Sequence, residues 1–420
     1  MGMNSPVKPV RKKVDTRKNH STQHFRLLCA VLVLTKLGDL LASPKIVLTW
    51  LLGAVGVSPV LISLLVPIRE SGSMIPQIAI GTWVNRFVYR KGLWQLGAFI
   101  QGLTVLGMAA ALWLLSGDTA GYTVLALLVL FSLARALCSV TIKDMQGKVI
   151  AKKQRGRLSG FAASIAGVLT FAVSLVFFID ASSVSTTMYL ALLLLAGLLW
   201  WLAGMLFWAV QEPPGENRQP GDNQSSALSH AWQLICRDRK FRHFLLSRAL
   251  LMGSALSAPF MLLLAQAKQT QSSTFALFLL ASSLAAGISA SVWGLMADQS
   301  SRRVMLLGGV FAALSCLAVW GTELQSNDAP VWLYALFYLS LSVAHEGVRI
   351  GRQTYLVNMA GGIKRTDYVS VSNTVIGSIL LLMGGITALL ASFSVSAVIF
   401  FLGLMGLAGS WSTWRMAETD

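Results

Sequence analysis

Ionisable side chains interrupt several stretches of the chain that are otherwise apolar. Burying such a group in a hydrocarbon medium costs roughly 3 kcal/mol or more, so each is expected to face a partner or a cavity. The chemistry available to them is binding of a charged solute, transfer of protons, and ion pairing between helices. The set consists of Lys36, Asp39, Arg69, Glu70, Arg135, His345, Glu346 and Arg349.

The spacing of these residues predicts which of them can pair within one helix. Lys36 and Asp39 are three residues apart, and so are Glu346 and Arg349. Positions three apart lie on the same helix face, so each couple can form an intrahelical ion pair. The carboxylates of Asp39, Glu70 and Glu346 are also candidate proton carriers, because burial and nearby cations shift the pKa of a carboxyl group in opposite directions.

Arg69 and Glu70 are adjacent, and neighbouring helical positions point about 100° apart. We therefore expect that they do not satisfy each other and that at least one reaches another helix. Two interpretations of the whole set stay open, namely structural ion pairs and a solute-binding cavity. A purely structural bundle needs no buried charge, because small residues at helical spacing already allow close packing. Such stripes are Ser159, Ala163 and Gly167, and Ser370, Thr374 and Gly377.

Motifs of enzymes are incomplete in this sequence. His345 and Glu346 begin a pattern like that of zinc proteases, but the position of the second histidine is Arg349, so no zinc site is expected. The sequence has neither a phosphate-binding loop with Gly-Lys-Ser/Thr nor a Gly-x-Ser-x-Gly nucleophile motif. We expect no enzyme activity, no metal and no cofactor.

The elements that must position the charged residues are membrane helices. The chain has 420 residues, of which 55% are hydrophobic and 12% charged, whereas a soluble domain has about a quarter charged residues. A membrane-spanning helix needs roughly 20 apolar residues. Apolar runs predict twelve spans, near 27–51, 58–84, 92–115, 120–145, 157–180, 187–210, 242–266, 272–297, 303–321, 330–355, 368–392 and 394–414.

The placement of basic residues predicts the orientation of the spans. Lys and Arg accumulate in alternate loops, which the positive-inside rule assigns to the cytoplasm together with both termini. The predicted parts are a basic tail at 1–24, a six-helix bundle at 25–210, a linker at 211–240, a second bundle at 241–415 and a short tail at 416–420. The opening segment is polar and basic, so no cleavable signal peptide is expected.

The net charge of +17 has a topological explanation, because the basic residues lie between apolar runs and form no single patch. We therefore expect no nucleic-acid partner. The cysteines Cys29, Cys138, Cys236 and Cys316 are far apart and have no metal-ligand spacing, so we interpret them as packing residues.

The two halves of the chain repeat each other. Phe25-Arg26 opens the first span and Phe241-Arg242 the seventh, about half the chain apart. The loop after the second span also recurs: Gly294 to Arg303 has the form G-x-x-x-D-x-x-x-R-R, and its first copy begins at Gly81. Duplication of a six-span unit in one orientation leaves this pattern.

With this duplicated plan and this loop motif, the chain resembles the major facilitator superfamily over essentially its whole length. The resemblance implies an all-α integral membrane fold of twelve helices in two pseudo-symmetric six-helix bundles, with spans 1, 4, 7 and 10 lining a central pathway and spans 2, 5, 8 and 11 joining the halves. It also implies a cytoplasmic gate motif formed by Gly81, Asn85, Arg86, Gly294, Asp298, Arg302 and Arg303, with Asn85 standing where the family has an acid.

The resemblance and the charged residues together predict a secondary active transporter that works by alternating access. Basic groups in the predicted cavity outnumber acidic ones, which favours a small anionic or zwitterionic organic solute, with protons or another coupling ion as co-substrate. The alternatives on the same fold are a multidrug exporter, a lysophospholipid exporter or flippase, and a sensor without transport. We expect a monomer in the lipid bilayer of a bacterial inner membrane.

Overall fold

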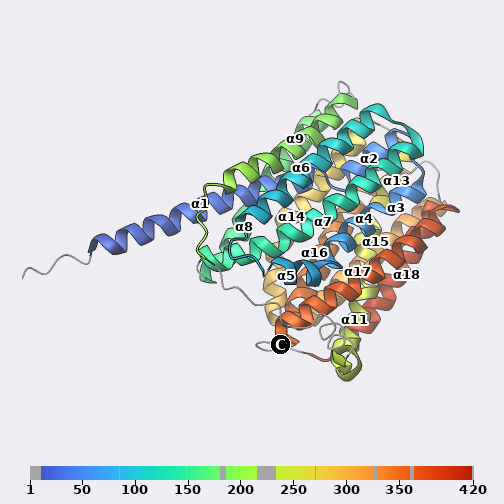
Figure 1. Ribbon diagram of the computed structural model, residues 1–420. Coiled ribbons are helices and arrows are strands. Elements are labelled where there is room, and N and C mark those ends of the chain that lie inside the picture. Colours follow the sequence, from blue (N-terminus) through green and yellow to red (C-terminus); the bar gives the residue numbers. More distant parts are fainter. Residues whose placement is uncertain are drawn as a thin grey trace, which may run out of the picture.

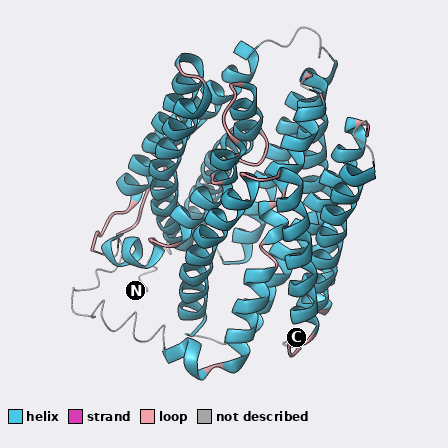
Figure 2. Ribbon diagram, turned by 90° about the vertical axis from the view of Figure 1, so that its right-hand side faces the viewer, coloured by secondary structure: helices cyan, strands magenta, loops and turns pink. Residues whose placement is uncertain are grey.

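The computed structural model describes residues 11–84, 86–150, 152–179, 186–214, 233–269, 271–325, 329–359 and 364–418. This part of the chain is helical and contains no strand (Figures 1 and 2). The helices of the first half are α1 (Arg11–Leu41), α2 (Val47–Ala54), α3 (Pro59–Ser63), α4 (Leu65–Met74), α5 (Gln77–Val84), α6 (Lys91–Leu114), α7 (Gly117–Val149), α8 (Lys152–Ile179) and α9 (Thr186–Phe207).

The second half begins after the linker. Its helices are α11 (Arg239–Leu250), α12 (Gly253–Leu256), α13 (Ala258–Lys268), α14 (Ser272–Gln299), α15 (Ser301–Gln325), α16 (Val331–Met359), α17 (Lys364–Ala391) and α18 (Val395–Trp414). Prolines accompany the breaks in both halves: Pro44 lies between α1 and α2, Pro76 precedes α5, and Pro259 is near the start of α13. Proline lacks the N–H that continues a helix, which explains breaks at these points.

Nine helical stretches among the described residues are long and apolar enough to cross a membrane. They coincide with nine of the predicted spans, and the chain is a multi-pass integral membrane protein. The other three predicted spans do not meet this criterion as single helices. The first two are divided among α1 to α5, and within α14 the apolar stretch found among the described residues is Ser273–Ala286.

The helices pack into two groups. In one group α6 packs against α7 and α9, and α1 packs against α8 and α9. In the other, α15 packs against α16 and α18, and α14 packs against α16. Contacts of α8 with α14 and of α4 with α17 join the groups, and these are the spans that the family resemblance assigned to the interface. We propose that the groups are the two bundles predicted at 25–210 and 241–415.

Small residues permit the crossing of α4 and α17. A Cβ added to Gly384 would lie 2.7 Å from Cβ of Pro67, and one added to Gly377 would lie 2.8 Å from Cγ1 of Ile75. The predicted stripe through Gly377 is therefore confirmed at that residue. The predicted stripe on α8 is wrong by one position, because Ala163 is exposed while Ala162 and Ala166 are buried.

The two ends of the bundle differ in how the groups meet. We call the end that holds the α9–α11 linker the linker end, and the opposite end the far end. At the far end α2 packs against α13, and Nε2 of Gln266 donates to the carbonyl oxygen of Trp50 at 3.0 Å. An aromatic cluster surrounds this bond, with ring centroids 5.7 Å apart for Trp50 and Phe275 and 5.0 Å for Tyr189 and Phe275.

Candidate functional site

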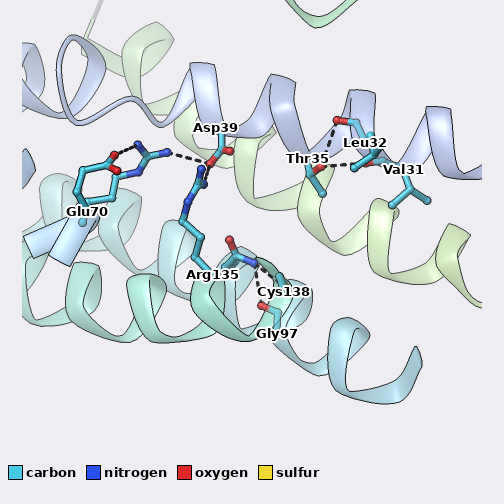
Figure 3. A network of polar contacts seen from close by, with 10 residues as sticks. Val31, Leu32, Thr35, Asp39, Glu70, Gly97, Arg135 and Cys138 are labelled. Carbon is cyan, nitrogen blue, oxygen red and sulfur yellow. Dashed lines mark hydrogen bonds and ion pairs between the residues drawn. The ribbon is translucent and has the colours of Figure 1, made fainter. Parts of the chain in front are cut away.

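A network of ion pairs connects α1, α4 and α7 in the middle of the first group (Figure 3). Asp39 on α1 accepts from Nη2 of Arg69 on α4 at 3.0 Å and from Nη1 of Arg135 on α7. The other terminal nitrogen of Arg69, Nη1, lies 3.2 Å from Oε1 of Glu70. One carboxylate is thus shared by two guanidinium groups from different helices.

This geometry corrects one prediction. Arg69 and Glu70 do contact each other although they are neighbours in sequence, because the long arginine side chain carries its planar fork away from the helix and offers two separate edges. The expectation that at least one of them reaches another helix is confirmed by the contact with Asp39. The side chains of Arg69, Asp39 and Arg135 are 12%, 24% and 32% exposed, so the network lies inside the bundle and keeps partial contact with its surroundings.

The predicted ion pair between Lys36 and Asp39 within α1 does not form, because Asp39 pairs with Arg69 and Arg135. Oδ1 of Asp39 is taken by Arg69 and Arg135, and Nζ of Lys36 forms no ion pair in the described part of the chain. Lys36 lies within electrostatic reach of Asp39, Arg135, Glu346 and Arg349, and so it faces the same space from α1.

Charged residues of α16 approach this space from the second group. Nε of Arg349 donates to Oε2 of Glu346 at 2.9 Å, which confirms the predicted intrahelical pair. Nδ1 of His345 lies 3.0 Å from Oγ of Ser254 on α12. The described residues contain no cluster of three or more His, Cys, Asp or Glu side chains that could hold a metal ion.

Two basic residues of the site were missed by the sequence analysis. Lys45 lies in the break between α1 and α2, within electrostatic reach of Glu70 and Glu346. Arg352 lies seven residues, about two helical turns, beyond His345 and is within electrostatic reach of the same two carboxylates. Neither Nζ of Lys45 nor the guanidinium of Arg352 has a hydrogen bond or ion pair to any residue that the structure describes.

A further buried arginine lies beside the interface between the groups. Arg248 on α11 is 6% exposed and donates to Ser372 at 2.5 Å and to Asn373 at 3.0 Å, both on α17. Asn373 in turn donates to Gln77 on α5 at 3.4 Å, which extends the chain of contacts to the first group.

The loop motif at the linker end has contacts that differ from its expected role. Arg302 binds the end of the chain: Nε is 2.6 Å from Glu418, and Nη1 donates to the carbonyl oxygens of Trp414 and Met416 at 3.0 Å. Asp298, Arg303 and Arg86 are exposed, and Asn85 lies outside the described residues. A Cβ at Gly81 or Gly294 would meet no atom within 4 Å, so close approach does not explain these glycines.

The first half has its own cluster at the linker end, which was not predicted. Glu212, which follows α9, pairs with Lys148 at 2.8 Å and accepts from the backbone N–H groups of Arg90 and Lys91 at 2.9 and 2.8 Å. The side chain of Arg90 pairs with Asp144 at 2.5 Å. Glu212 and Glu418 both follow the last helix of a group and bind near the start of its third span, which agrees with the internal repeat.

Comparisons with known proteins find similarity in structure and none in sequence. No family model matches the chain, and no curated protein does either. Among solved structures, nucleoside transporter NupG superposes with a TM-score of 0.70 at 11% identity over 93% of this chain and 98% of that chain. A D-xylose-proton symporter gives 0.71 at 13% identity over 94% and 98%.

A POT family transporter in complex with 5-aminolevulinic acid gives a TM-score of 0.72 at 11% identity over 93% of this chain and 95% of that chain. All three are transporters. At such low identity the likeness concerns the fold alone. The chain has the fold of the major facilitator superfamily transporters, the family that its sequence resembles.

Proposed function

We propose that this protein is a secondary transporter that moves a small anionic or zwitterionic organic solute across the membrane by alternating access. The observation that carries the proposal is a set of basic side chains, Lys36, Lys45 and Arg352, that have no ion-pair partner among the described residues and lie within electrostatic reach of Glu346. They come from both groups of helices, so a solute bound to them would touch both halves. We call the region around these three side chains and the ion-pair network of Asp39, Arg69 and Arg135 the chamber.

The charge balance of the chamber supports an anionic group on the solute. The carboxylates of Asp39, Glu70 and Glu346 already contact Arg69, Arg135 and Arg349. The remaining cations are held in a bundle interior, where an uncompensated charge is costly and a bound anion relieves that cost. Guanidinium and ammonium groups bind carboxylates and phosphates through charge-assisted hydrogen bonds.

Alternating access requires a seal that can form on either side of the chamber in turn. The aromatic cluster of Trp50, Tyr189 and Phe275, with the bond from Gln266, supports a seal at the far end. In the predicted orientation the far end is extracytoplasmic, and the conformation described here would then admit solute from the cytoplasmic side. The solved transporters with the same fold support this mechanism by analogy.

Proton coupling follows from the same carboxylates. Among the described residues, Glu346 forms an ion pair only with Arg349 on its own helix, whereas Asp39 pairs with arginines of two other helices. A carboxylate whose cationic partner moves between two conformations binds protons with a different affinity in each. We therefore propose Glu346 as the proton carrier, because its ion pair lies within one helix and does not hold two helices together.

Ligand-dependent thermal stability of the purified protein in lipid nanodiscs tests the binding proposal. Organic anions, cations and neutral solutes of similar size are compared, and a ligand present at 100 times its Kd adds about 2.7 kcal/mol. Anions or zwitterions should stabilise the protein, and Lys45→Met and Arg352→Met should abolish the effect. Lys240→Met is the matched control, because Lys240 is exposed and outside the chamber.

Transport itself is measured in proteoliposomes with the anion that stabilises the protein. Uptake should respond to an imposed pH gradient, and Glu346→Gln should retain binding but lose that response. Stabilisation by cations alone, or stabilisation that survives both cavity variants, would refute the anionic site.

A further inference from the structure

An apolar groove runs along the first helix on the linker-end side of the charged chamber. Its volume is about 420 Å³, within the range of about 300–1,000 Å³ that is common for small-molecule sites. It is lined by Phe25, Arg26, Cys29, Ala30, Val33 and Leu34 of α1 and by Ile165 of α8. Arg26 is the only charged residue among these lining residues.

The groove is continuous with the face of α1 that carries Lys36. Cys29, Val33 and Lys36 follow one another at spacings of four and three residues, so they lie on one side of the helix. The rise of about 1.5 Å per residue places Lys36 one turn beyond Val33. A ligand held by Lys36 can therefore extend into the groove without leaving this face.

The groove and the chamber have opposite character. Lys36, which has no ion pair among the described residues, lies one helical turn beyond the groove, and alkyl and aromatic side chains line most of the groove itself. A sugar or an inorganic anion would leave this apolar surface uncovered, whereas an apolar tail would pack against it. Arg26, exposed near the linker end of the groove, adds a positive charge that attracts anions toward the entrance.

We infer that the transported solute is an amphipathic organic anion, whose charged group binds among Lys36, Lys45 and Arg352 and whose aliphatic or aromatic tail lies in the groove between α1 and α8. This inference rests on the proposed function and adds the chemical class of the substrate. Specificity then comes from two parts of one site, with charge selecting the head and volume selecting the tail.

A homologous series of carboxylates tests the inference. Binding of acetate, butyrate and hexanoate to the full-length protein in nanodiscs is measured by thermal stabilisation and by competition. Each methylene that is fully buried should tighten binding about fourfold. Hexanol, which has the hexanoate tail without the charge, controls for partition into the lipid.

Two variants test whether the dependence of affinity on chain length arises in the groove or from partition of longer chains into lipid. Ala30→Phe places a large side chain in the groove and should remove the dependence on chain length, because the tail can no longer enter. Ala110→Phe makes the same change at an exposed position of α6 and should behave like the parent protein.

A second readout avoids reliance on the folding of Ala30→Phe. In a Cys236→Ser background, alkylation of Cys29 in the groove by a maleimide should be slowed by hexanoate and not by acetate at equal occupancy. Equal affinity for acetate and hexanoate, or a chain-length dependence that survives Ala30→Phe, would overturn the inference and leave the proposed function standing. Failure of every anion to bind would refute both.

Discussion

Replacing Asp39 by Asn removes the anion that two arginines share. Arg69 would keep its contact with Glu70, whereas Arg135 would lose its only ion pair among the described residues. Breaking a fully buried pair from one side costs about 3–5 kcal/mol. Because Arg135 remains 32% exposed and can be partly hydrated, we expect Asp39→Asn to lower the free energy of unfolding by about 2–3 kcal/mol.

The size of the coupling is measured with a double-mutant cycle in mixed micelles, where unfolding is followed by tryptophan fluorescence. Arg135→Gln in the Asp39→Asn background should cost much less than in the parent protein, because the charge it removes is already unpaired. The coupling energy should be about 1–3 kcal/mol. A control is Glu346→Gln, which breaks a pair within one helix to a 42% exposed arginine and should cost below about 0.5 kcal/mol.

A loss of less than about 0.5 kcal/mol for Asp39→Asn, with additive effects in the cycle, would contradict this reasoning. It would mean that water screens the network and that the ion pairs between α1, α4 and α7 contribute nothing to the free energy of unfolding.

Three further predictions concern the seal, the helix crossing and the linker. Gly53→Ala places a Cβ 2.3 Å from Oε1 of Gln266, so this side chain must shift and its hydrogen bond to Trp50 should be lost. With that bond absent, a cysteine introduced at the far end should react faster with a membrane-impermeant maleimide. Gly384→Val overfills the contact with Pro67 and should cost about 1–3 kcal/mol in chemical unfolding. Partial burial raises the pKa of Asp238, but hydrogen bonds from the Tyr368 hydroxyl and from two backbone N–H groups outweigh it and lower that pKa. A carboxyl with a lowered pKa stabilises the folded state above its unfolded pKa and loses that contribution as the pH falls below about 4; Tyr368→Phe should reduce this acid sensitivity in unfolding experiments.

Some features of the site were predictable because they depend on local geometry. The Glu346–Arg349 pair follows from a spacing of three on one helix, and the structure contains it. Burial of charge in α1, α4, α7 and α16 likewise follows from apolar runs that contain ionisable residues. Spacing rules failed for Arg69 and Glu70, because they treat side chains as fixed directions and ignore the reach of a forked guanidinium.

Other features depend on how separate helices meet. Lys45 lies in the break between α1 and α2, beside Pro44, so helical spacing does not predict its neighbours. Arg352 lies near Glu70 only because α16 of one group approaches α4 of the other. The buried face of α8 carries Ala162 and Ala166, one residue from the predicted stripe, because the neighbour that covers it is distant in sequence.

The sequence by itself determined that the chain is a multi-pass membrane protein with a duplicated plan, since apolar runs, loop charges and internal repeats are properties of one chain read from end to end. The tertiary structure alone decided which charges share a partner and which stay unpaired. Ion pairing depends on distances between atoms of different helices, and those distances are set by packing that no local pattern records.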